Sequence, residues 1–324
     1  MNVHLINPMM NACGGSELRT LAYCRELSAA GPVTVWSEST PAGTLMAAAP
    51  IRRLAAGNHP LGGVLIFVGC YFKVGAWLCA AAPERVIVVV NTPSVEAIRR
   101  FLDQLAQHGA PPPEFVYAAR WLEARVGRPG IVDWSPIDPQ RFRPRPQRRA
   151  AGRFRIGRLS RDVVGKHHPD DPALYRALVA AGMTVRLMGA HCLYPATAPE
   201  PGVELLAVGA EPAEAFLAGL DCFFYRTHPT WTEPHGRVVT EAMACGLPVV
   251  CDARGGYTEF IANGVNGFLF SGNAQALEIL NYLRHSPGVC RRTGQAARRS
   301  IVDLLAVRQP FLEFCRAPAR ASLS

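Results

Sequence analysis

The chain has 324 residues, of which 49% are hydrophobic and 18% are charged, and its formal net charge is +9. Such a composition excludes a disordered chain, and the length is sufficient for two domains. No apolar run reaches the roughly 18 residues that span a bilayer, and the N-terminal sequence MNVHLINPMM lacks a basic leader. We therefore expect a cytoplasmic protein without a signal peptide.

Ten cysteines are scattered along the chain without a C-x-x-C pair. The sequence therefore carries no zinc or redox signature. Nearly all cations are arginines, and only Lys73 and Lys166 are lysines. Arginines cluster between Arg141 and Arg161. This cluster suits an anionic partner, such as a nucleotide phosphate, a lipid surface or nucleic acid, but it is equally compatible with a solvated surface.

In the first part of the chain, short runs rich in Val and Ile alternate with helical patterns. Strands are predicted over residues 3–8, 33–37, 64–69, 85–90 and 115–118. Their nearly continuous apolar character is typical of parallel strands that are covered on both faces. A helix is predicted between the first two strands, where Ser16 or Gly15 can cap its start and Gly31 can end it.

Residues 135–153 break this rhythm, because they are rich in Pro and Arg and have no apolar period. We interpret them as a linker between two domains. The alternation then restarts. Further strands are predicted over residues 154–159, 184–190, 203–209, 221–227, 247–252 and 267–270, and helices over 173–182, 212–219, 236–245, 274–285 and 289–305.

Two consecutive series of this kind predict an α/β protein with two doubly wound, Rossmann-like domains that face each other across a cleft. We expect the first domain to cover residues 1–150 and the second to cover residues 151–308. Residues 309–324 are expected to form a C-terminal helix or tail that can return to the first domain. Ligands of such sheets bind beyond the carboxyl ends of the strands, so the cleft is the expected site.

The helix predicted over residues 236–245 begins like an anion-binding site. A helix N-terminus presents unpaired N–H groups and a partial positive charge, which suit a phosphate. Glu233 precedes this helix and Glu241 lies within it. Eight helical steps span about 12 Å, so the two carboxylates could contact a sugar and a ribose of one extended ligand. The alternatives are an ion pair of Glu241 with Arg237 and a simple interaction of Glu233 with the helix dipole.

The segment TEPHGRVVTEAMACGLPVVCDARGGYTEFIANGVNGFLF, residues 232–270, resembles the signature of retaining glycosyltransferase family 4, which has the GT-B fold. The shared pattern is a Glu, seven residues, a second Glu, A-M-A-x-G-x-P-V-V, a Gly-Gly turn and N-G-x-x-G-F-L. The resemblance implies that Glu233 meets the donor sugar and that Glu241 meets the ribose hydroxyls. It also assigns donor contacts to His235, Gly236, Arg237 and Val238. The family usually has Phe where this chain has His235, which leaves the choice of donor open.

A second segment, GRLSRDVVGKHHPD at residues 157–170, resembles the G-R-L-S…K-G element whose Arg and Lys bind the donor diphosphate in that family. Arg158 matches the Arg directly. Lys166 is the best match for the Lys, at a spacing about two residues longer than usual, and Arg161 is an alternative. Fixed cations stabilise the negative charge that builds up on a departing nucleoside diphosphate. The alternative is that these residues are solvated surface cations.

In the N-terminal half, the Gly-Gly turn after the first strand resembles the family's G-G-x-E segment. Gly14 and Gly15 would allow the backbone to approach the donor phosphate. This turn is not a G-x-G-x-x-G fingerprint, which disfavours a nicotinamide-dependent enzyme. After residues 85–90 the family often has a His that lines the reaction centre, and here Asn91 stands on this acceptor side. Asn can bind a sugar hydroxyl but cannot serve as a base at neutral pH.

The resemblance implies a retaining glycosyltransferase of the hexosyltransferase type, which moves a sugar from a nucleoside-diphosphate sugar to an acceptor hydroxyl. Glu233, Arg158 and Lys166 would be its catalytic groups, and neither a cofactor nor a metal is expected. The acceptor could be a glycan, a lipid-linked molecule or a small molecule. The positive charge is compatible with peripheral contact to the anionic inner membrane face, and no nucleic acid is expected.

Two alternatives stay open. Asn91 and His235 motivate a GT-B protein that binds a sugar nucleotide but has lost turnover. A protein of another class would bind nucleic acid or anionic membrane through the arginines between Arg141 and Arg161.

Overall fold

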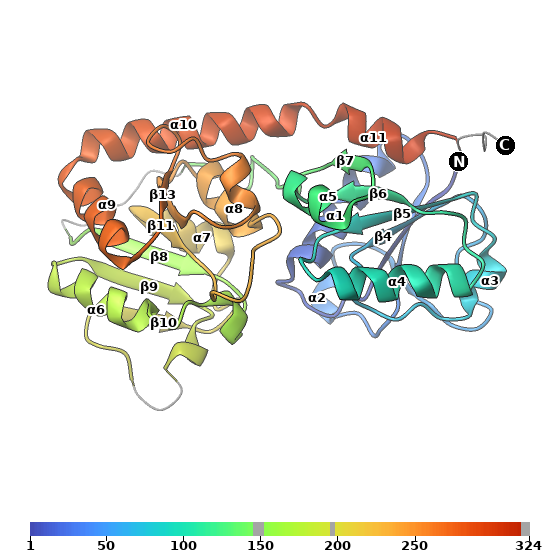
Figure 1. The fold of residues 1–324 in the computed structure, drawn as a ribbon, viewed down its shortest axis with the longest axis horizontal. Coiled ribbons are helices and arrows are strands. Elements are labelled where there is room, and N and C mark those ends of the chain that lie inside the picture. The colour runs from blue at the N-terminus through green and yellow to red at the C-terminus, as the bar shows by residue number, and fades with distance from the viewer. Residues whose placement is uncertain (145–151, 195–197, 319–324) are drawn as a thin grey trace. The chain divides into compact units, whose positions relative to one another are not determined.

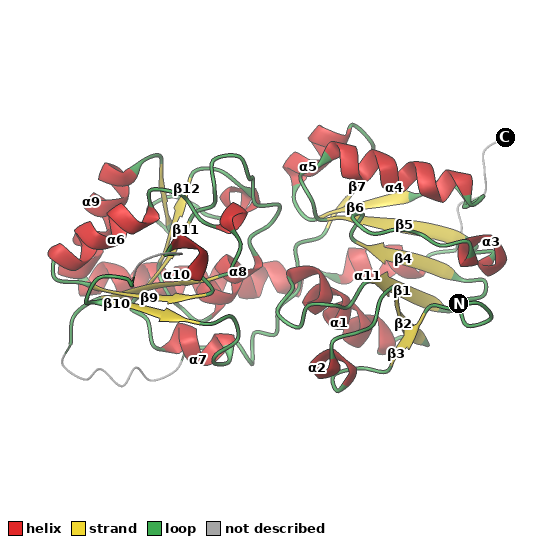
Figure 2. Ribbon diagram, turned by 90° about the horizontal axis from the view of Figure 1, so that it is seen from below, coloured by secondary structure: helices red, strands yellow, loops and turns green. Residues whose placement is uncertain are grey.

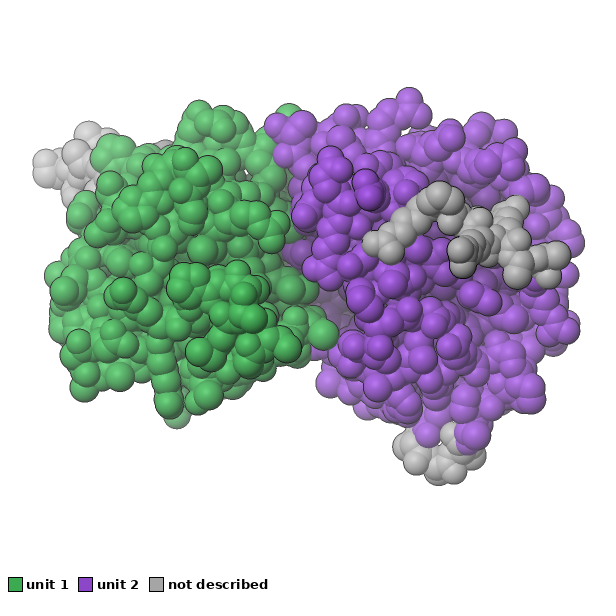
Figure 3. All heavy atoms as spheres, turned by 180° about the vertical axis from the view of Figure 1, so that it is seen from behind, with its two compact units in different colours: residues 1–136, 307–324 green, residues 137–306 purple. Residues whose placement is uncertain are grey.

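The computed structural model describes residues 1–144, 152–194 and 198–318. The chain divides into two compact units, which are drawn in different colours in Figure 3. Unit 1 comprises residues 1–136 and 307–324, and unit 2 comprises residues 137–306. Each unit is an α/β domain on a parallel sheet (Figure 1). Within the described residues, no helix combines the length and the apolar character that a membrane span needs.

Unit 1 contains a seven-stranded parallel sheet with the order β3-β2-β1-β4-β5-β6-β7. Its strands are β1 Val3–Asn7, β2 Val33–Ser37, β3 Ile51–Arg53, β4 Val64–Val68, β5 Arg85–Val90, β6 Glu114–Tyr117 and β7 Gly130–Val132. Its helices are α1 Gly15–Ser28, α2 Gly43–Met46, α3 Trp77–Ala81, α4 Val95–Gln107, α5 Arg120–Val126 and α11 Gln309–Arg316. The five strands predicted in this half are confirmed. The edge strands β3 and β7 were not predicted, because each has three residues and neither is fully buried.

Successive side chains of these strands point to opposite faces of the sheet, so each face has its own apolar core. On one face, strand residues such as Phe67 pack with Phe101 of α4 and with α3 and α5. On the other face, α1 and α11 pack against the sheet, and the rings of Tyr23 and Phe311 lie 4.6 Å apart. Figure 2 shows helices on both faces of this sheet.

The C-terminal helix is held in unit 1 by charge as well as by packing. Arg308, just before α11, contacts Glu26 of α1 at 2.7 Å and Asp133 at 2.6 Å. Tyr23 donates a hydrogen bond to the same Asp133 at 2.6 Å. Tyr23 and Asp133 are buried and the Arg308 side chain is only 11% exposed, so the contacts tie α11 firmly to this sheet.

Unit 2 contains a six-stranded parallel sheet with the order β10-β9-β8-β11-β12-β13. Its strands are β8 Arg155–Leu159, β9 Thr184–Met188, β10 Val203–Leu206, β11 Cys222–Tyr225, β12 Val249–Asp252 and β13 Phe268–Phe270. Its helices are α6 Asp171–Ala180, α7 Ala213–Ala218, α8 Arg237–Ala244, α9 Asn273–His285 and α10 Pro287–Ala306. The short 3-10 helices are η1 Val164–Lys166, η2 His191–Leu193 and η3 Gly256–Glu259. The six strands and five helices predicted in this half are confirmed.

In this sheet too, successive side chains of a strand point to opposite faces. Phe223 and Tyr225 of β11 belong to the core under α7, α8 and α10. Their neighbours Cys222 and Phe224 belong to the core under α6 and α9. Because the strand order reverses between β8 and β11, the loops that follow these two strands diverge and leave a binding position at their carboxyl ends.

The division between the units differs from the predicted boundary near residue 150. Ile137 and Phe142 are buried in the core of unit 2, and Arg298 of α10 donates hydrogen bonds to the carbonyl oxygens of Phe142 and Ala244. The chain therefore already belongs to unit 2 at residue 137. Residues 145–151, which include part of the predicted linker and of the arginine cluster, lie outside the described residues.

Candidate functional site

The candidate site lies in unit 2 at the carboxyl ends of β8 and β11. The loop after β8 carries Arg161 and Lys166, and the loop after β11 carries Glu233 and leads into α8. These are the two strands between which the strand order reverses, so the fold itself brings the two predicted segments together.

The central contact is an ion pair between Lys166 and Glu233. The Lys166 Nζ atom lies 2.5 Å from Glu233 Oε2, and the two side chains are only 12% and 11% exposed. Tyr225, at the end of β11, donates a hydrogen bond of 2.8 Å to the same carboxylate oxygen. Burial by itself would raise the pKa of Glu233, but Lys166, Tyr225 and Arg161 outweigh it and hold this pKa below its ordinary value. The carboxylate is therefore ionised at neutral pH.

Trp231 and Tyr225 are contacts of this pair that the sequence analysis missed. The Lys166 Nζ atom lies 5.3 Å from the centroid of the Trp231 ring, in a cation–π contact. The indole Nε1 of Trp231 is buried and has no hydrogen-bond partner among the residues that the structure describes. In the sequence, Tyr225 looks like an ordinary core residue of a strand, so its contact with Glu233 could not be predicted. Trp231 could have been noticed, because it is an aromatic residue in a polar loop two residues before Glu233.

The Gly-Gly turn of the motif holds the backbone of Glu233. Gly256 donates a backbone hydrogen bond of 2.8 Å to the carbonyl oxygen of Glu233. A Cβ atom on Gly256 would lie 2.0 Å from the carbonyl oxygen of Pro234. Gly236 starts α8 with φ +86°, a conformation that side chains disfavour. These glycines therefore shape the turn that positions Glu233.

Gly256→Ala is expected to destabilise unit 2 by roughly 2 kcal/mol or more, because the backbone of Pro234 would have to move. Gly272→Ala is the matched control, since a Cβ there meets no atom within 4 Å and its φ of −166° is ordinary extended backbone. Urea unfolding of both variants measures the difference. Equal unfolding midpoints for the two variants would show that the turn is not sterically constrained.

The start of α8 has the geometry of an anion site. The first backbone bonds of the helix run from the N–H groups of Val239 and Thr240 to the carbonyl oxygen of Gly236. The N–H groups of Arg237 and Val238 precede them, at the end of the helix that favours anions. His235, next to this start, is 5% exposed, and its ring lies 5.4 Å from that of Phe260.

Glu241 forms an ion pair with Arg237, which is the alternative to a ribose contact that its spacing allowed. Arg237 donates a hydrogen bond of 2.8 Å from its Nε atom to Glu241 Oε1. Glu241 is 3% exposed, and its burial raises the pKa of the carboxyl despite the neighbouring arginine. In this structure Arg237 therefore already engages one oxygen of the Glu241 carboxylate.

Arg158 is placed differently from the prediction of direct phosphate contact. Its side chain is 1% exposed, and it donates hydrogen bonds to Asp171 and to the carbonyl oxygen of Arg226, both at 3.0 Å. It also donates to the carbonyl oxygen of Lys166. In this structure Arg158 lies beneath the turn that carries Lys166, because buried partners surround its guanidinium. Arg161, on the same loop, is exposed.

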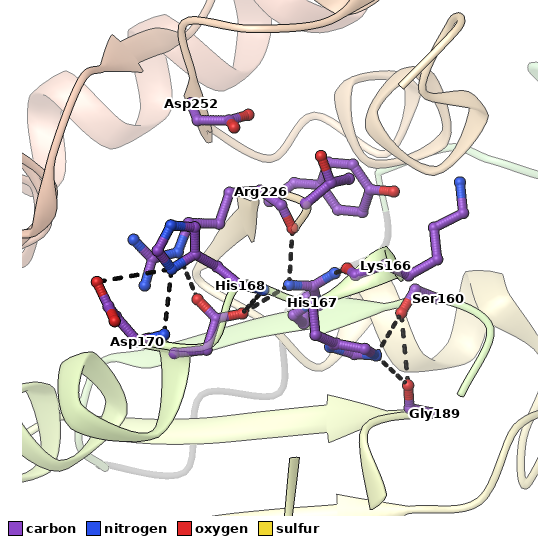
Figure 4. Close-up of polar contacts among 12 residues, drawn as sticks. Ser160, Lys166, His167, His168, Asp170, Gly189, Arg226 and Asp252 are labelled. Carbon is purple, nitrogen blue, oxygen red and sulfur yellow. Dashed lines mark hydrogen bonds and ion pairs between the residues drawn. The ribbon is translucent and has the colours of Figure 1, made fainter. Parts of the chain in front are cut away.

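Asp171 is the buried centre of this network and was not predicted from the sequence. It accepts a bond of 3.0 Å from Arg158 and one of 2.5 Å from Arg226, which follows β11. The backbone N–H of His168 donates to it at 3.3 Å. Arg226 also contacts Asn273 at the start of α9 at 2.6 Å. Figure 4 shows His168 beside Asp170, with the ring of His167 directed toward Gly189 and Ser160.

Gly14, Gly15 and Asn91 belong to unit 1, and the structure describes them within that unit. A Cβ on Gly14 would lie 2.0 Å from Glu17 Oε2, whereas a Cβ on Gly15 would meet no atom within 4 Å. Asn91 follows β5 and donates a hydrogen bond of 3.1 Å to the Ser16 hydroxyl. The atom that a side chain at Gly14 would meet therefore belongs to Glu17 of the same unit.

The architecture of the two units is the GT-B fold. Over 97% of this chain and 99% of the other, the structure resembles that of Anabaena Alr3699/HepE in complex with UDP, with a TM-score of 0.75 and 17% sequence identity. Residues 205–300 match the family model described as Glycosyl transferases group 1. Glu233, Glu241 and α8 lie inside the matched segment, and Arg158 and Lys166 precede it.

Two curated relatives match over part of the chain. Spore coat protein SA of Bacillus subtilis is 42% identical over 72 residues, which are 21% of this chain and 19% of that protein. D-inositol 3-phosphate glycosyltransferase of Kribbella flavida is 38% identical over 71 residues, which are 21% of this chain and 17% of that protein. The matched part of the chain thus spans less than a fifth of the length of these relatives.

Proposed function

We propose that the protein is a retaining glycosyltransferase of the hexosyltransferase type that uses a nucleoside-diphosphate sugar. The observation that carries this proposal is the Lys166–Glu233 pair, which places a cation and a sugar-binding carboxylate side by side before the N-terminus of α8. The match of residues 205–300 to the group 1 family model supports it. The similar Anabaena HepE structures hold UDP, UDP with glucose, or UDP-glucose, which favours a uridine nucleotide.

The proposed roles follow from what each group offers. Lys166, the exposed Arg161 and the start of α8 bind the diphosphate and stabilise the charge that builds on it. Glu233 accepts hydrogen bonds from sugar hydroxyls, and Glu241 accepts them from the ribose once Arg237 has turned away. Arg158 acts through Lys166, since it binds the carbonyl oxygen of that residue.

The proposed reaction needs no protein nucleophile. The bond between the anomeric carbon and the diphosphate oxygen breaks, and the acceptor oxygen forms a new bond to that carbon on the same face. The acceptor proton passes to the departing diphosphate. Asn91 is proposed to bind a hydroxyl on the acceptor side, where a glycan, a lipid-linked molecule or a small molecule would supply the attacking group.

The test is a panel of nucleoside-diphosphate sugars, with release of the nucleoside diphosphate as the readout. Turnover or slow hydrolysis of one donor is expected. Tight binding of a donor without any turnover would favour a GT-B protein that has lost catalysis. Salt-sensitive binding to DNA or anionic vesicles, unchanged by nucleotide and by Glu241→Ala, would favour the basic binding protein instead.

A thermal-shift panel with UDP, GDP, ADP and CDP should single out one base, because ligand binding to the folded state raises its stability by mass action. Glu241→Ala is expected to reduce this shift clearly. Glu278→Ala is the matched control, because Glu278 is an exposed glutamate of α9 in the same unit. The assignment of Glu241 to the nucleotide fails if both variants keep the full shift.

A further inference from the structure

Asp162, His167 and Cys192 form a cluster of metal-binding side chains in unit 2. Each offers one ligand atom, and the three atoms lie within 4.8 Å of one another. Asp162 lies in the loop after β8, His167 directly follows η1, and Cys192 lies in η2 after β9. Among the described residues, this is the one group of three or more such ligands. A carboxylate oxygen, an imidazole nitrogen and a thiol sulfur thus converge from two loops, the one after β8 and the one after β9.

One ring nitrogen of His167 is hydrogen-bonded to a backbone carbonyl, as is common in metal-binding histidines. His167 is 1% exposed, and its Nε2 atom lies 2.9 Å from the carbonyl oxygen of Gly189 and 3.2 Å from the Ser160 hydroxyl (Figure 4). A ring nitrogen that donates to a carbonyl fixes the tautomer and leaves the other nitrogen with a free lone pair. The Nδ1 atom of His167 is buried and makes no hydrogen bond within the part of the chain that the structure describes.

Asp162 is fixed against the turn that carries the thiol. Its Oδ1 atom accepts a hydrogen bond of 2.8 Å from the backbone N–H of Cys192. Its Oδ2 atom lies 3.4 Å from the Nδ1 atom of His191, so a second imidazole stands at the edge of the cluster. The loop after β8 and the loop after β9 are therefore already joined through this carboxylate.

We propose that Asp162, His167 and Cys192 bind one zinc ion. Oxygen, nitrogen and sulfur donors together suit Zn²⁺, whereas Mg²⁺ and Ca²⁺ require oxygen ligands. With ligand atoms at most 4.8 Å apart, an inward shift of less than about 1 Å by each brings them to zinc-bond lengths of roughly 2.0–2.3 Å. His191 or a water completes the fourth position. The bound ion would fasten the loop that carries Arg161 and Lys166 to η2.

No metal is predicted from the sequence, because it has no closely spaced cysteines and the family that it resembles does not call for a metal. The three ligands stand at positions 162, 167 and 192, and only the parallel pairing of β8 with β9 brings the last of them to the other two. The zinc proposal does not rest on the proposed glycosyl transfer, because none of the three ligands is assigned to the donor.

The test is a titration of the purified, metal-free full chain with Co²⁺, whose bond to a thiolate gives a charge-transfer band in the near ultraviolet. The wild type is expected to develop this band at one equivalent, and Zn²⁺ is expected to abolish it. Cys192→Ser should remove the band and weaken zinc binding at least about 100-fold. Asp162→Asn, which retains an oxygen for the Cys192 N–H, should weaken zinc binding at least about 10-fold.

Cys79→Ser is the matched control. Cys79 is an exposed cysteine of unit 1 whose Sγ atom lies 3.6 Å from His108 Nδ1, so it is the competing cobalt site to exclude. This variant should keep the band. The proposal is overturned if the wild type shows no thiolate band, or if the band survives in Cys192→Ser; its loss in Cys79→Ser would place the cobalt at Cys79 instead. Circular dichroism confirms that each variant is folded. The nucleotide thermal shift is measured separately, so a failure of the zinc proposal can be distinguished from a failure of the proposed glycosyl transfer.

Discussion

Lys166→Ala is expected to lower kcat/KM for the sugar-nucleotide donor by roughly 10²–10³-fold. The reason is that the variant lacks a fixed cation where the departing diphosphate gathers charge, and a single electrostatic group of this kind is worth about that factor. The Lys166 Nζ atom is already held at the site by Glu233 and the Trp231 ring, so it needs little reorganisation to act. Initial rates of nucleoside diphosphate release measure the effect.

The control for this variant is Lys73→Ala, which changes the chain's other lysine. Its rates should equal those of the wild type. Folding of Lys166→Ala is checked by circular dichroism, because the change leaves the Glu233 carboxylate with Tyr225 as its remaining close partner. Wild-type kcat/KM in a folded Lys166→Ala protein would rule out the proposed role of Lys166.

Asp171→Ala should reduce the free energy of unfolding of unit 2 by about 3–5 kcal/mol. Removing one partner from a buried ion pair leaves the other charge uncompensated, and here Arg158 and Arg226 both lose their carboxylate. The turn that carries Lys166 should loosen as well, since Arg158 binds its backbone. Donor turnover is therefore expected to fall although Asp171 is fully buried and is not assigned to the donor.

Glu200→Ala is the matched control. Glu200 forms an ion pair with Arg176, whose side chain is 68% exposed. Such surface pairs contribute at most about 1 kcal/mol. Urea unfolding can be followed for unit 2 alone by fluorine NMR of 5-fluorotryptophan, since Trp231 is the one tryptophan of residues 137–306. If Asp171→Ala and Glu200→Ala cost the same, the buried network is not a major source of stability.

Much of the fold could be predicted because its signals are local. The runs of Val and Ile in β4, β5 and β12 identify buried parallel strands, and the glycines around residues 236 and 255–256 mark tight turns. The two carboxylates and the cations of the candidate site could be proposed from the sequence because their motifs are contiguous. The edge strands were missed because three half-exposed residues carry too little pattern.

The rest depends on long-range packing that no local pattern records. Arg158 looks like a site cation at the end of a strand, but Asp171 and Arg226 arrive from α6 and from the end of β11 and enclose it. The four-residue spacing of Arg237 and Glu241 allows their ion pair to be anticipated, but not how deeply α8 buries it. The Asp162, His167 and Cys192 cluster likewise exists only after β8 and β9 have paired.

The central claim is that unit 2 binds a nucleoside diphosphate through Lys166, and calorimetric titration tests it most directly. One of UDP, GDP, ADP and CDP should bind the full-length wild type and Lys73→Ala with the same affinity and one-to-one stoichiometry. Lys166→Ala should bind that nucleotide at least about 10-fold more weakly, because a charge-assisted contact is worth about 1.5–3 kcal/mol. Equal affinity of all three proteins, or no binding of any of the four nucleotides to the wild type, would contradict the account.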